Sequence, residues 1–242
     1  MSAANSSSRH LEPLDDVLAC IGWTPLVRLR RVTEGIRTPV LGKAEYLNPG
    51  ASVKDRIGLA IIEAAERDGL LKPGGTVVEG TGGNTGVALA MVAAIKGYRC
   101  IFTMPDKMSS EKVRLLKALG AEVVITPTAV TPDSPEHYIN AAKKIAQDIP
   151  GAFLANQFYN RVNTECHYQT TGPEIWEQTG GKVRAVITGA GTGGTISGAG
   201  RYLKEQDDRV RMILADPVGS VYKQFHETES IGSGGVYKVE GI

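Results

Sequence analysis

The chain has 242 residues, enough for one large domain or two small ones, and apolar residues make up 42% of it. Its formal net charge is +1, so composition gives no support for nucleic acid or an anionic membrane as a partner. Cys20, Cys100 and Cys166 show no CxxC spacing, which argues against a zinc site or a disulfide framework and favours a reducing compartment.

The chain begins with a polar segment. Its first ten residues, MSAANSSSRH, lack the apolar centre of a signal peptide. No stretch approaches the ~20 apolar residues that a membrane-spanning helix needs. We therefore expect a disordered start over residues 1–10, on a cytoplasmic protein that does not bind a membrane.

Helices and strands are expected to alternate after this start. Residues 12–22 predict a short helix, and two strands should follow at 24–32 and 38–46. Apolar residues at helical spacing from Ile57 predict a longer helix that ends before Gly69. Beyond it, β-branched runs predict strands at 76–80, 100–105, 121–127, 185–191 and 210–217. Helical patterns separate these strands at 87–97, 109–120, 134–148, 167–178 and 195–206.

This alternation is typical of an α/β protein with open, mostly parallel sheets flanked by helices. Ligands of such sheets bind beyond the carboxyl ends of the strands, so the loops there are candidate sites. The helical and strand patterns weaken around residues 158–166, where we place the boundary between two domains. The first domain would cover 11–165, with crossover strands to the second, and the second would begin at 166 and run to 242.

The segment NPGASVKDR, residues 48–56, contains a lysine that local electrostatics disfavour. NPG reads as a turn, and Ser52 with Asp55 forms the pattern of a capping box, so a helix should begin here. Lys54 would then lie in the first turn, where the helix dipole opposes an ammonium group by roughly 0.3–1 kcal/mol. The default for a lone lysine is a solvated side chain, here beside Asp55 and Arg56.

The segment EGTGGNTG, residues 79–86, joins a predicted strand to a predicted helix. Thr81, Asn84 and Thr85 lie between glycines, so backbone N–H groups and hydroxyls there could bind a carboxylate while Asn84 reaches a second polar group. The alternative is that Asn84 or Thr85 only caps the helix.

A second glycine loop, GAGTGG at residues 189–194, also joins a strand to a helix. Backbone N–H groups freed by small residues at a helix start can bind a phosphate, and Thr192 and Thr195 add hydroxyls suited to a terminal phosphate. A glycine-rich turn that only packs tightly is one alternative. The loop also fits the GxGxxG dinucleotide fingerprint, with Asp216 at about the expected distance of ~20 residues, so a nicotinamide or flavin enzyme is a competing hypothesis. Its late position in the chain, and a further candidate ligand loop at 217–220, count against that hypothesis.

Together, a lysine at a helix start, a polar loop for a carboxylate and a loop for a phosphate describe a site for pyridoxal 5′-phosphate and an amino acid. Lys54 would supply the amine for a Schiff base with the cofactor. Its place at a helix N-terminus and its burial by the cofactor should lower the pKa of the amine and leave more of it neutral.

Histidines give no sign of a metal site. The four are scattered and show no metal-ligand spacing, so we expect surface or capping roles for all of them. They are His10, His137, His167 and His226.

Several motifs, taken in order, resemble the fold-type II pyridoxal-phosphate enzymes of the cysteine synthase and cystathionine β-synthase group. The resemblance extends from about Leu11 to Ile242, and it implies the tryptophan synthase β-like fold with its carboxyl-terminal part missing. The motifs are ASVKDR at 51–56, EGTGGNTG at 79–86, NQF at 156–158, TTGPEIW at 170–176 and GTGGT at 191–195.

The resemblance also implies roles for individual residues. Lys54 would be the Schiff-base lysine and the base for the α-proton, and Asn84 would hydrogen-bond the phenolic oxygen of the cofactor. Its phosphate would be bound by Gly191, Thr192, Gly193, Gly194 and Thr195. The substrate carboxylate would be bound by Thr81, Gly82, Asn84, Thr85 and Gln157. Gly82 replaces a serine that is commoner in the family, so it keeps the N–H group and loses a hydroxyl.

Within this group, residues 104–124, 133–138 and 215–220 are more similar to cystathionine β-synthase than to cysteine synthase. The implied reaction replaces the β-substituent of L-serine, or of O-acetylserine, with a thiol. Cysteine synthase activity, with O-acetylserine and sulfide, is the first alternative. A homodimer is implied as well, and the chain resembles the amino-terminal portion of the family, so an inactive binding remnant is a further hypothesis alongside the NAD-linked oxidoreductase.

Overall fold

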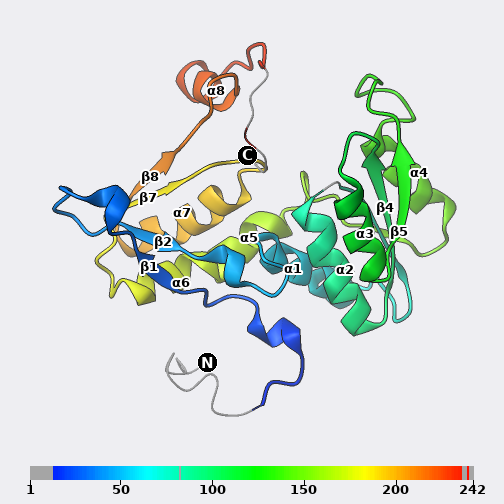
Figure 1. Cartoon of the computed structure of the whole chain (residues 1–242), viewed down its shortest axis with the longest axis horizontal. Helices are drawn as coiled ribbons and strands as arrows, with labels where there is room; N and C mark the ends of the chain where they lie inside the picture. Colours follow the sequence, from blue (N-terminus) through cyan, green and yellow to red (C-terminus); the bar gives the residue numbers. More distant parts are fainter. Residues whose placement is uncertain (1–12, 82, 236–238, 240–242) are drawn as a thin grey trace. The chain divides into compact units, whose positions relative to one another are not determined.

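The computed structural model describes residues 13–81, 83–235 and 239, and in it the chain forms two compact units (Figure 1). The first unit runs to Asn156 and the second begins at Gln157. Both contain parallel strands with helices, which confirms the predicted α/β class. Compact units do not by themselves define folding domains, so the division predicted between residues 165 and 166 stays a prediction. Residues 1–10, predicted to be disordered, lie outside the described residues, as does Gly82.

Four parallel strands form the main sheet of the first unit, in the order β5-β4-β3-β6. The two central strands are almost wholly buried, which is why they appear in the sequence as continuous apolar runs rather than as alternating patterns. Because the strands are parallel, the loops that follow them emerge at one edge of the sheet. The strands are β3 (Thr76–Gly80), β4 (Arg99–Pro105), β5 (Glu122–Thr126) and β6 (Phe153–Leu154).

The α-helices of the first unit pack on this sheet and on one another. Ala142 of α4 lies in one hydrophobic cluster with Val78 and Ile101 of the central strands, so the apolar face of this helix covers the sheet. A Cβ atom on Gly58 would lie only 2.7 Å from Ala88 Cβ, so a glycine at this position lets α1 and α2 cross closely. The helices are α1 (Lys54–Arg67), α2 (Asn84–Lys96), α3 (Ser110–Ala118) and α4 (Tyr138–Asp148).

The segment that precedes α1 contains short elements. β1 (Leu26–Arg28) pairs antiparallel with β2 (Leu41–Lys43), in agreement with the two predicted strands, although each is only three residues long. Among the described residues of this segment, 3-10 helices lie before, between and after the two strands, and the first of them falls where a short helix was predicted over 12–22. They are η1 (Val17–Cys20), η2 (Arg31–Thr33) and η3 (Glu45–Leu47).

The second unit has two parallel strands and four helices among the residues that the structure describes. β7 pairs with β8, and Val186 and Met212 on these strands pack against a cluster of Ile175, Leu203 and Val210. The elements are α5 (Val162–Gln169), α6 (Thr171–Gln178), β7 (Ala185–Thr188), α7 (Gly194–Gln206), β8 (Arg211–Leu214) and α8 (Tyr222–Thr228).

Several element bounds differ from those predicted. The helix predicted from 134 begins at Tyr138, because the preceding residues form a turn with a hydrogen bond from His137 N–H to Ser134 O. The segment 167–178 is divided between α5 and α6, and the strand predicted over 185–191 ends at Thr188, where the glycine loop begins. β6 and α8 were not predicted, since each is too short for a clear period. No helix among the described residues has the length and apolar character needed to cross a membrane.

Candidate active site

The first turn of α1 places Lys54 next to a dense hydrogen-bond network. The helix begins at Lys54, and its backbone N–H donates to Ser52 Oγ at 3.1 Å. Asp55 does not complete the predicted capping box by bonding the Ser52 N–H. Its carboxylate instead accepts the Gly50 N–H at 2.5 Å, which closes the NPG turn onto the helix. A Cβ atom on Gly50 would lie 2.5 Å from Asp55 Oδ1, so this contact requires a glycine.

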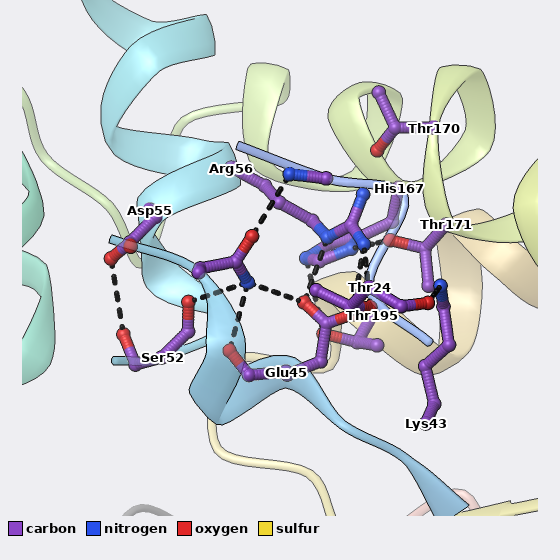
Figure 2. Close-up of polar contacts among 12 residues, drawn as sticks. Thr24, Lys43, Glu45, Ser52, Asp55, Arg56, His167, Thr170, Thr171 and Thr195 are labelled. Carbon is purple, nitrogen blue, oxygen red and sulfur yellow. Dashed lines mark hydrogen bonds and ion pairs between the residues drawn. The ribbon is translucent and has the colours of Figure 1, made fainter. Parts of the chain in front are cut away.

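Arg56, which is buried, forms an ion pair with the partly buried Glu45 close to this turn (Figure 2). Arg56 Nε lies 2.8 Å from Glu45 Oε2, and Arg56 Nη2 lies 2.8 Å from Oε1. Thr24 Oγ1 donates to Glu45 Oε1 at 2.5 Å. Burial by itself would raise the pKa of Glu45, but the hydrogen bond and charge of Arg56, with Thr24 and Lys43, lower it to about 2. The carboxylate therefore stays ionised across the physiological pH range.

Asn48 connects this ion pair to the turn before Lys54. Its amide nitrogen donates to Glu45 Oε2 at 3.0 Å and to the Ser52 carbonyl at 3.0 Å, and its side-chain oxygen accepts the Gly22 N–H at 2.9 Å. Asn48 and Ser52 are both buried. A continuous set of hydrogen bonds thus extends from Glu45 through Asn48 and Ser52 to the backbone of Lys54.

The Lys54 side chain is half-buried, and burial lowers the pKa of its amine. The alternative of a solvated lysine beside Asp55 and Arg56 on an exposed helix end is wrong, because Asp55 is 0% and Arg56 3% exposed. A larger share of the Lys54 amine is therefore neutral than in a solvated lysine, and a neutral amine is the form that acts as a nucleophile or base.

The loop after β3 lies at the carboxyl edge of the main sheet, as predicted. Thr81 is buried, and its Oγ1 accepts the Gly83 N–H at 3.3 Å. The N-cap of the helix that follows is Gly83, and Asn84 and Thr85 are the first two residues inside the helix, so the alternative that one of them is only the N-cap is wrong. Asn84 is exposed at the start of α2, whereas Thr85 is buried.

Lys54 and Asn84 lie at corresponding places on two helices that touch. The two helices are in close contact at Gly58 and Ala88. Gly58 lies four residues after Lys54, and Ala88 lies four residues after Asn84. Four residues correspond to about 6 Å along a helix axis, so both N-terminal turns lie within about one turn of the crossing point. Asn156, which follows the neighbouring strand β6, donates its N–H to Glu79 Oε2 at 2.6 Å, and Gln157 is the next residue.

The glycine loop of the second unit follows β7 and begins α7. Gly193, the N-cap residue, has φ +78°, a left-handed conformation that favours glycine. A Cβ atom on Gly194 would lie 2.1 Å from Asn163 Oδ1, so that position has no room for a side chain. The first backbone N–H groups of α7 lack intrahelical partners, as at any helix start, and they can bind an anion.

Thr192 of this loop and Thr195, the second residue of α7, each contact a side chain of α5. Asn163 Nδ2 lies 2.8 Å from Thr192 Oγ1, and His167 Nε2 lies 3.1 Å from Thr195 Oγ1. His167 is 1% exposed, and its Nδ1 lies 2.8 Å from Thr171 Oγ1 (Figure 2). The expected surface or capping role of His167 is therefore wrong. The spacing of Asn163 and His167, four residues apart on a helix, is the sequence signal that could have indicated their common face.

Asp216, the acidic residue of the alternative dinucleotide fingerprint, accepts a hydrogen bond from the backbone of the second unit. Its Oδ2 accepts the Lys223 N–H at 2.9 Å, which stabilises the start of α8. Residues 217–220, considered as a ligand loop, lead into that helix, and Tyr222 OH donates to the Gly191 carbonyl.

Comparison with known proteins agrees with these features. A family model described as Pyridoxal-phosphate dependent enzyme matches residues 17–234. Cystathionine beta-synthase of Saccharomyces cerevisiae is 47% identical over 251 residues, which cover 100% of this chain and 48% of that protein. Cysteine synthase 1 of Neurospora crassa is 52% identical over 206 residues, which cover 85% of this chain and 54% of that protein.

A solved structure is similar as well. The crystal structure of a hydrogen sulfide-producing enzyme from Fusobacterium nucleatum superposes with a TM-score of 0.85 at 35% identity, covering 96% of this chain and 73% of that one. The chain spans about half the length of the curated relatives it matches.

Proposed function

This chain belongs to the family of pyridoxal-phosphate-dependent enzymes, and from that premise we propose that Lys54 is the residue that binds the cofactor covalently. The single observation that carries the proposal is the Lys54 amine, which is half-buried at the first turn of α1 with its pKa lowered by burial. A carbonyl group condenses with a neutral amine and not with an ammonium group. Burial therefore shifts Lys54 toward the neutral state that the cofactor aldehyde requires.

The loop at Gly191, Thr192, Gly193, Gly194 and Thr195 is proposed to bind the phosphate group. Two threonine hydroxyls and the backbone N–H groups at the start of α7 form a set of donors without a bulky side chain at Gly194. Such a donor set fits the terminal phosphate of pyridoxal 5′-phosphate, which has three oxygens to satisfy.

The loop after β3 is proposed to bind the substrate. The N-terminus of α2, with the hydroxyls of Thr81 and Thr85, fits the carboxylate of an amino acid, because such a group needs several N–H and O–H donors. The exposed Asn84 amide can donate to the phenolic oxygen of the cofactor. Gly82 and Gln157 complete the set proposed for the carboxylate.

We propose that the reaction is a β-replacement on L-serine, or on O-acetylserine, with a thiol. When bound, pyridoxal phosphate supplies an electron sink that stabilises negative charge at the substrate Cα. Lys54 would accept the proton from Cα and return it at the end of the reaction, which requires its pKa to be lowered as burial does here. The 47% identity to cystathionine beta-synthase over the whole chain favours homocysteine as the thiol.

Cysteine synthase activity is the second candidate within this class. The observation in its favour is the 52% identity to the Neurospora crassa enzyme over 85% of this chain. Assays of the purified chain with serine or O-acetylserine, each combined with homocysteine or sulfide, separate the two activities by product. Cystathionine from serine and homocysteine is the expected product, and cysteine alone would favour the second candidate.

Lys54 is tested by borohydride trapping. Reduction of the yellow, cofactor-loaded chain should fix a pyridoxyl group on Lys54, read out by peptide mass spectrometry. Lys54→Ala should abolish turnover, whereas Lys182→Ala, at an exposed lysine of the second unit, should leave it unchanged. A label on a lysine other than Lys54 would overturn the assignment.

The family match rules against the alternative of a NAD-linked oxidoreductase. The alternative of a binding remnant is tested on the same sample. Such a remnant would fold, bind the cofactor poorly and turn over none of the four substrate pairs. We also propose a cytoplasmic homodimer, for which sedimentation equilibrium and fluorescence localisation are the tests.

A further inference from the structure

We propose that Asn163 and His167 are positioning residues that turn the hydroxyls of Thr192 and Thr195 into hydrogen-bond donors toward the cofactor phosphate. The inference rests on the proposed phosphate role of the glycine loop. It concerns four side chains of the second unit, two on α5 and two at the start of α7.

The first step is the common face of α5. Asn163 and His167 are four residues apart, so they lie on the same side of the helix, and both are buried. α7 packs closely against this face, because a Cβ atom on Gly198 would lie only 2.1 Å from the Thr164 carbonyl oxygen. The same Cβ atom would lie 2.8 Å from His167 Cβ, so His167 lies directly against α7.

The second step is the direction of the hydrogen bonds at Thr192. Asn163 Nδ2 lies 3.2 Å from the Gln157 carbonyl, which can only accept, so this atom is the amide nitrogen and donates. The same nitrogen donates to Thr192 Oγ1 at 2.8 Å, and the Gly194 N–H donates to that oxygen at 3.3 Å. Both acceptor positions of the hydroxyl are then used. The Thr192 proton is left to donate to another group.

The third step applies the same reasoning to Thr195. A neutral imidazole has one N–H donor and one acceptor nitrogen, and His167 faces a hydroxyl at each nitrogen. If Thr171 donates to Nδ1, the proton is on Nε2, which donates to Thr195 Oγ1. The Thr195 hydroxyl then also has its proton available for an anion. The opposite tautomer would use that proton inside the protein and direct lone pairs toward the phosphate, which repels them.

The test compares two ligands that differ only in the phosphate ester. We expect His167→Leu to weaken binding of pyridoxal 5′-phosphate roughly 10- to 100-fold, the range for hydrogen bonds to charged groups, and to leave pyridoxal binding unchanged. Absorbance titration gives both dissociation constants. A mutation that only loosens the fold would weaken both ligands equally, and that outcome would overturn the inference.

A double-mutant cycle shows whether His167 acts through Thr195. His167→Leu and Thr195→Val should each weaken phosphate-ester binding, and the double variant should be no weaker than the more affected single variant. His167→Gln, which places an amide nitrogen near the position of Nε2, should recover part of the affinity. Additive losses in the double variant would show that His167 acts independently and would contradict the inference. Asn163→Leu with Thr192→Val forms the parallel cycle.

The tautomer is measured directly on the unmodified chain. Nitrogen-15 correlation spectra of the imidazole rings, with His167 assigned by its loss in His167→Gln, should show the proton on Nε2. Thr171→Ser should keep this tautomer and Thr171→Val should not. A proton on Nδ1 in the unmodified chain would overturn the inference even if no variant folds. Absence of any pyridoxal-phosphate binding by the unmodified chain would refute the proposed function instead, which keeps the two failures distinct.

Discussion

Arg56 and Glu45 form two hydrogen bonds of 2.8 Å, at a place where the Arg56 side chain is 1% exposed. Removing one partner of such a buried pair leaves a charge without compensation, which costs several kcal/mol, whereas an exposed pair contributes little. Because Arg56 lies two residues after Lys54, the pair fixes the helix turn that carries the proposed cofactor lysine.

Glu45→Gln should therefore destabilise the chain in a pH-dependent way. The pKa of Glu45 is about 2 in the folded chain, against an ordinary value of 4.5, so the ionised carboxylate contributes about 3 kcal/mol of stability at pH 7. This contribution is fully present above the ordinary value and is lost as the pH falls from about 5 toward 2. Denaturant unfolding of the unmodified chain and of Glu45→Gln across this pH range measures the contribution. The difference between their free energies of unfolding should shrink toward pH 2.

The control for this prediction is the exposed ion pair of Arg99 and Glu122, 2.7 Å apart. Both side chains are more than half exposed, so Glu122→Gln should change the free energy of unfolding little at any pH. A loss for Glu45→Gln that stayed constant from pH 7 to pH 2 would contradict the pH dependence described for Glu45.

Asn48→Ala should loosen the turn before Lys54. It removes the donor to Glu45 and to the Ser52 carbonyl and leaves buried polar groups unpaired, at a cost of about 1–3 kcal/mol in the free energy of unfolding. The rate at which Lys54 reacts with pyridoxal phosphate, followed by absorbance, should fall as well. Asn140→Ala is the control, since Asn140 also anchors a loop through two backbone carbonyls, at Pro132 and Ser134. It should cost stability without changing that rate.

Much of the fold could be predicted from the sequence, for a physical reason. Buried parallel strands appear as continuous apolar runs and their helices as apolar residues at helical spacing, so β3, β4 and α7 were predicted to within one residue at each end. α8 and β6 could not be predicted in this way, because elements of seven and two residues are too short to show a hydrophobic period. The turn at 134–137 was included in a helix because its polar residues resemble a first helical turn.

The candidate site was predictable where the chemistry lies in a local pattern. Lys54 and the two glycine loops each form a contiguous motif, and the structure places all of them after strand ends or at helix starts. The supporting residues were not predictable in this way. Glu45 and Arg56 come from separate elements, and His167 meets Thr195 only because α5 packs on α7. Such contacts depend on tertiary packing, which no local spacing specifies.

Lys54→Met should stabilise the chain at neutral pH. Burial lowers the pKa of Lys54 below its ordinary 10.5, so the folded chain binds that proton less tightly than the unfolded chain does. The free energy of unfolding should therefore rise with pH between the lowered value and 10.5, and methionine removes this dependence. The stabilisation by Lys54→Met should be largest at neutral pH and should shrink as the pH approaches 10.5. Lys182→Met, at an exposed lysine, is the control, and an equal gain there would refute burial as the cause.

Gly194→Ala should impair the proposed phosphate site far more than Gly193→Ala. A Cβ atom at Gly194 would lie 2.1 Å from Asn163 Oδ1, so the loop or Asn163 must move, and the donor to Thr192 moves with it. At Gly193 a Cβ atom would approach nothing nearer than Ser197 Oγ at 3.9 Å, and only the left-handed φ of +78° opposes alanine, by roughly 1–2 kcal/mol. We expect Gly194→Ala to weaken pyridoxal 5′-phosphate binding more than tenfold in absorbance titrations. Gly193→Ala should mainly lower the melting temperature, and equal affinity losses in the two variants would show that the Asn163 contact does not matter for binding.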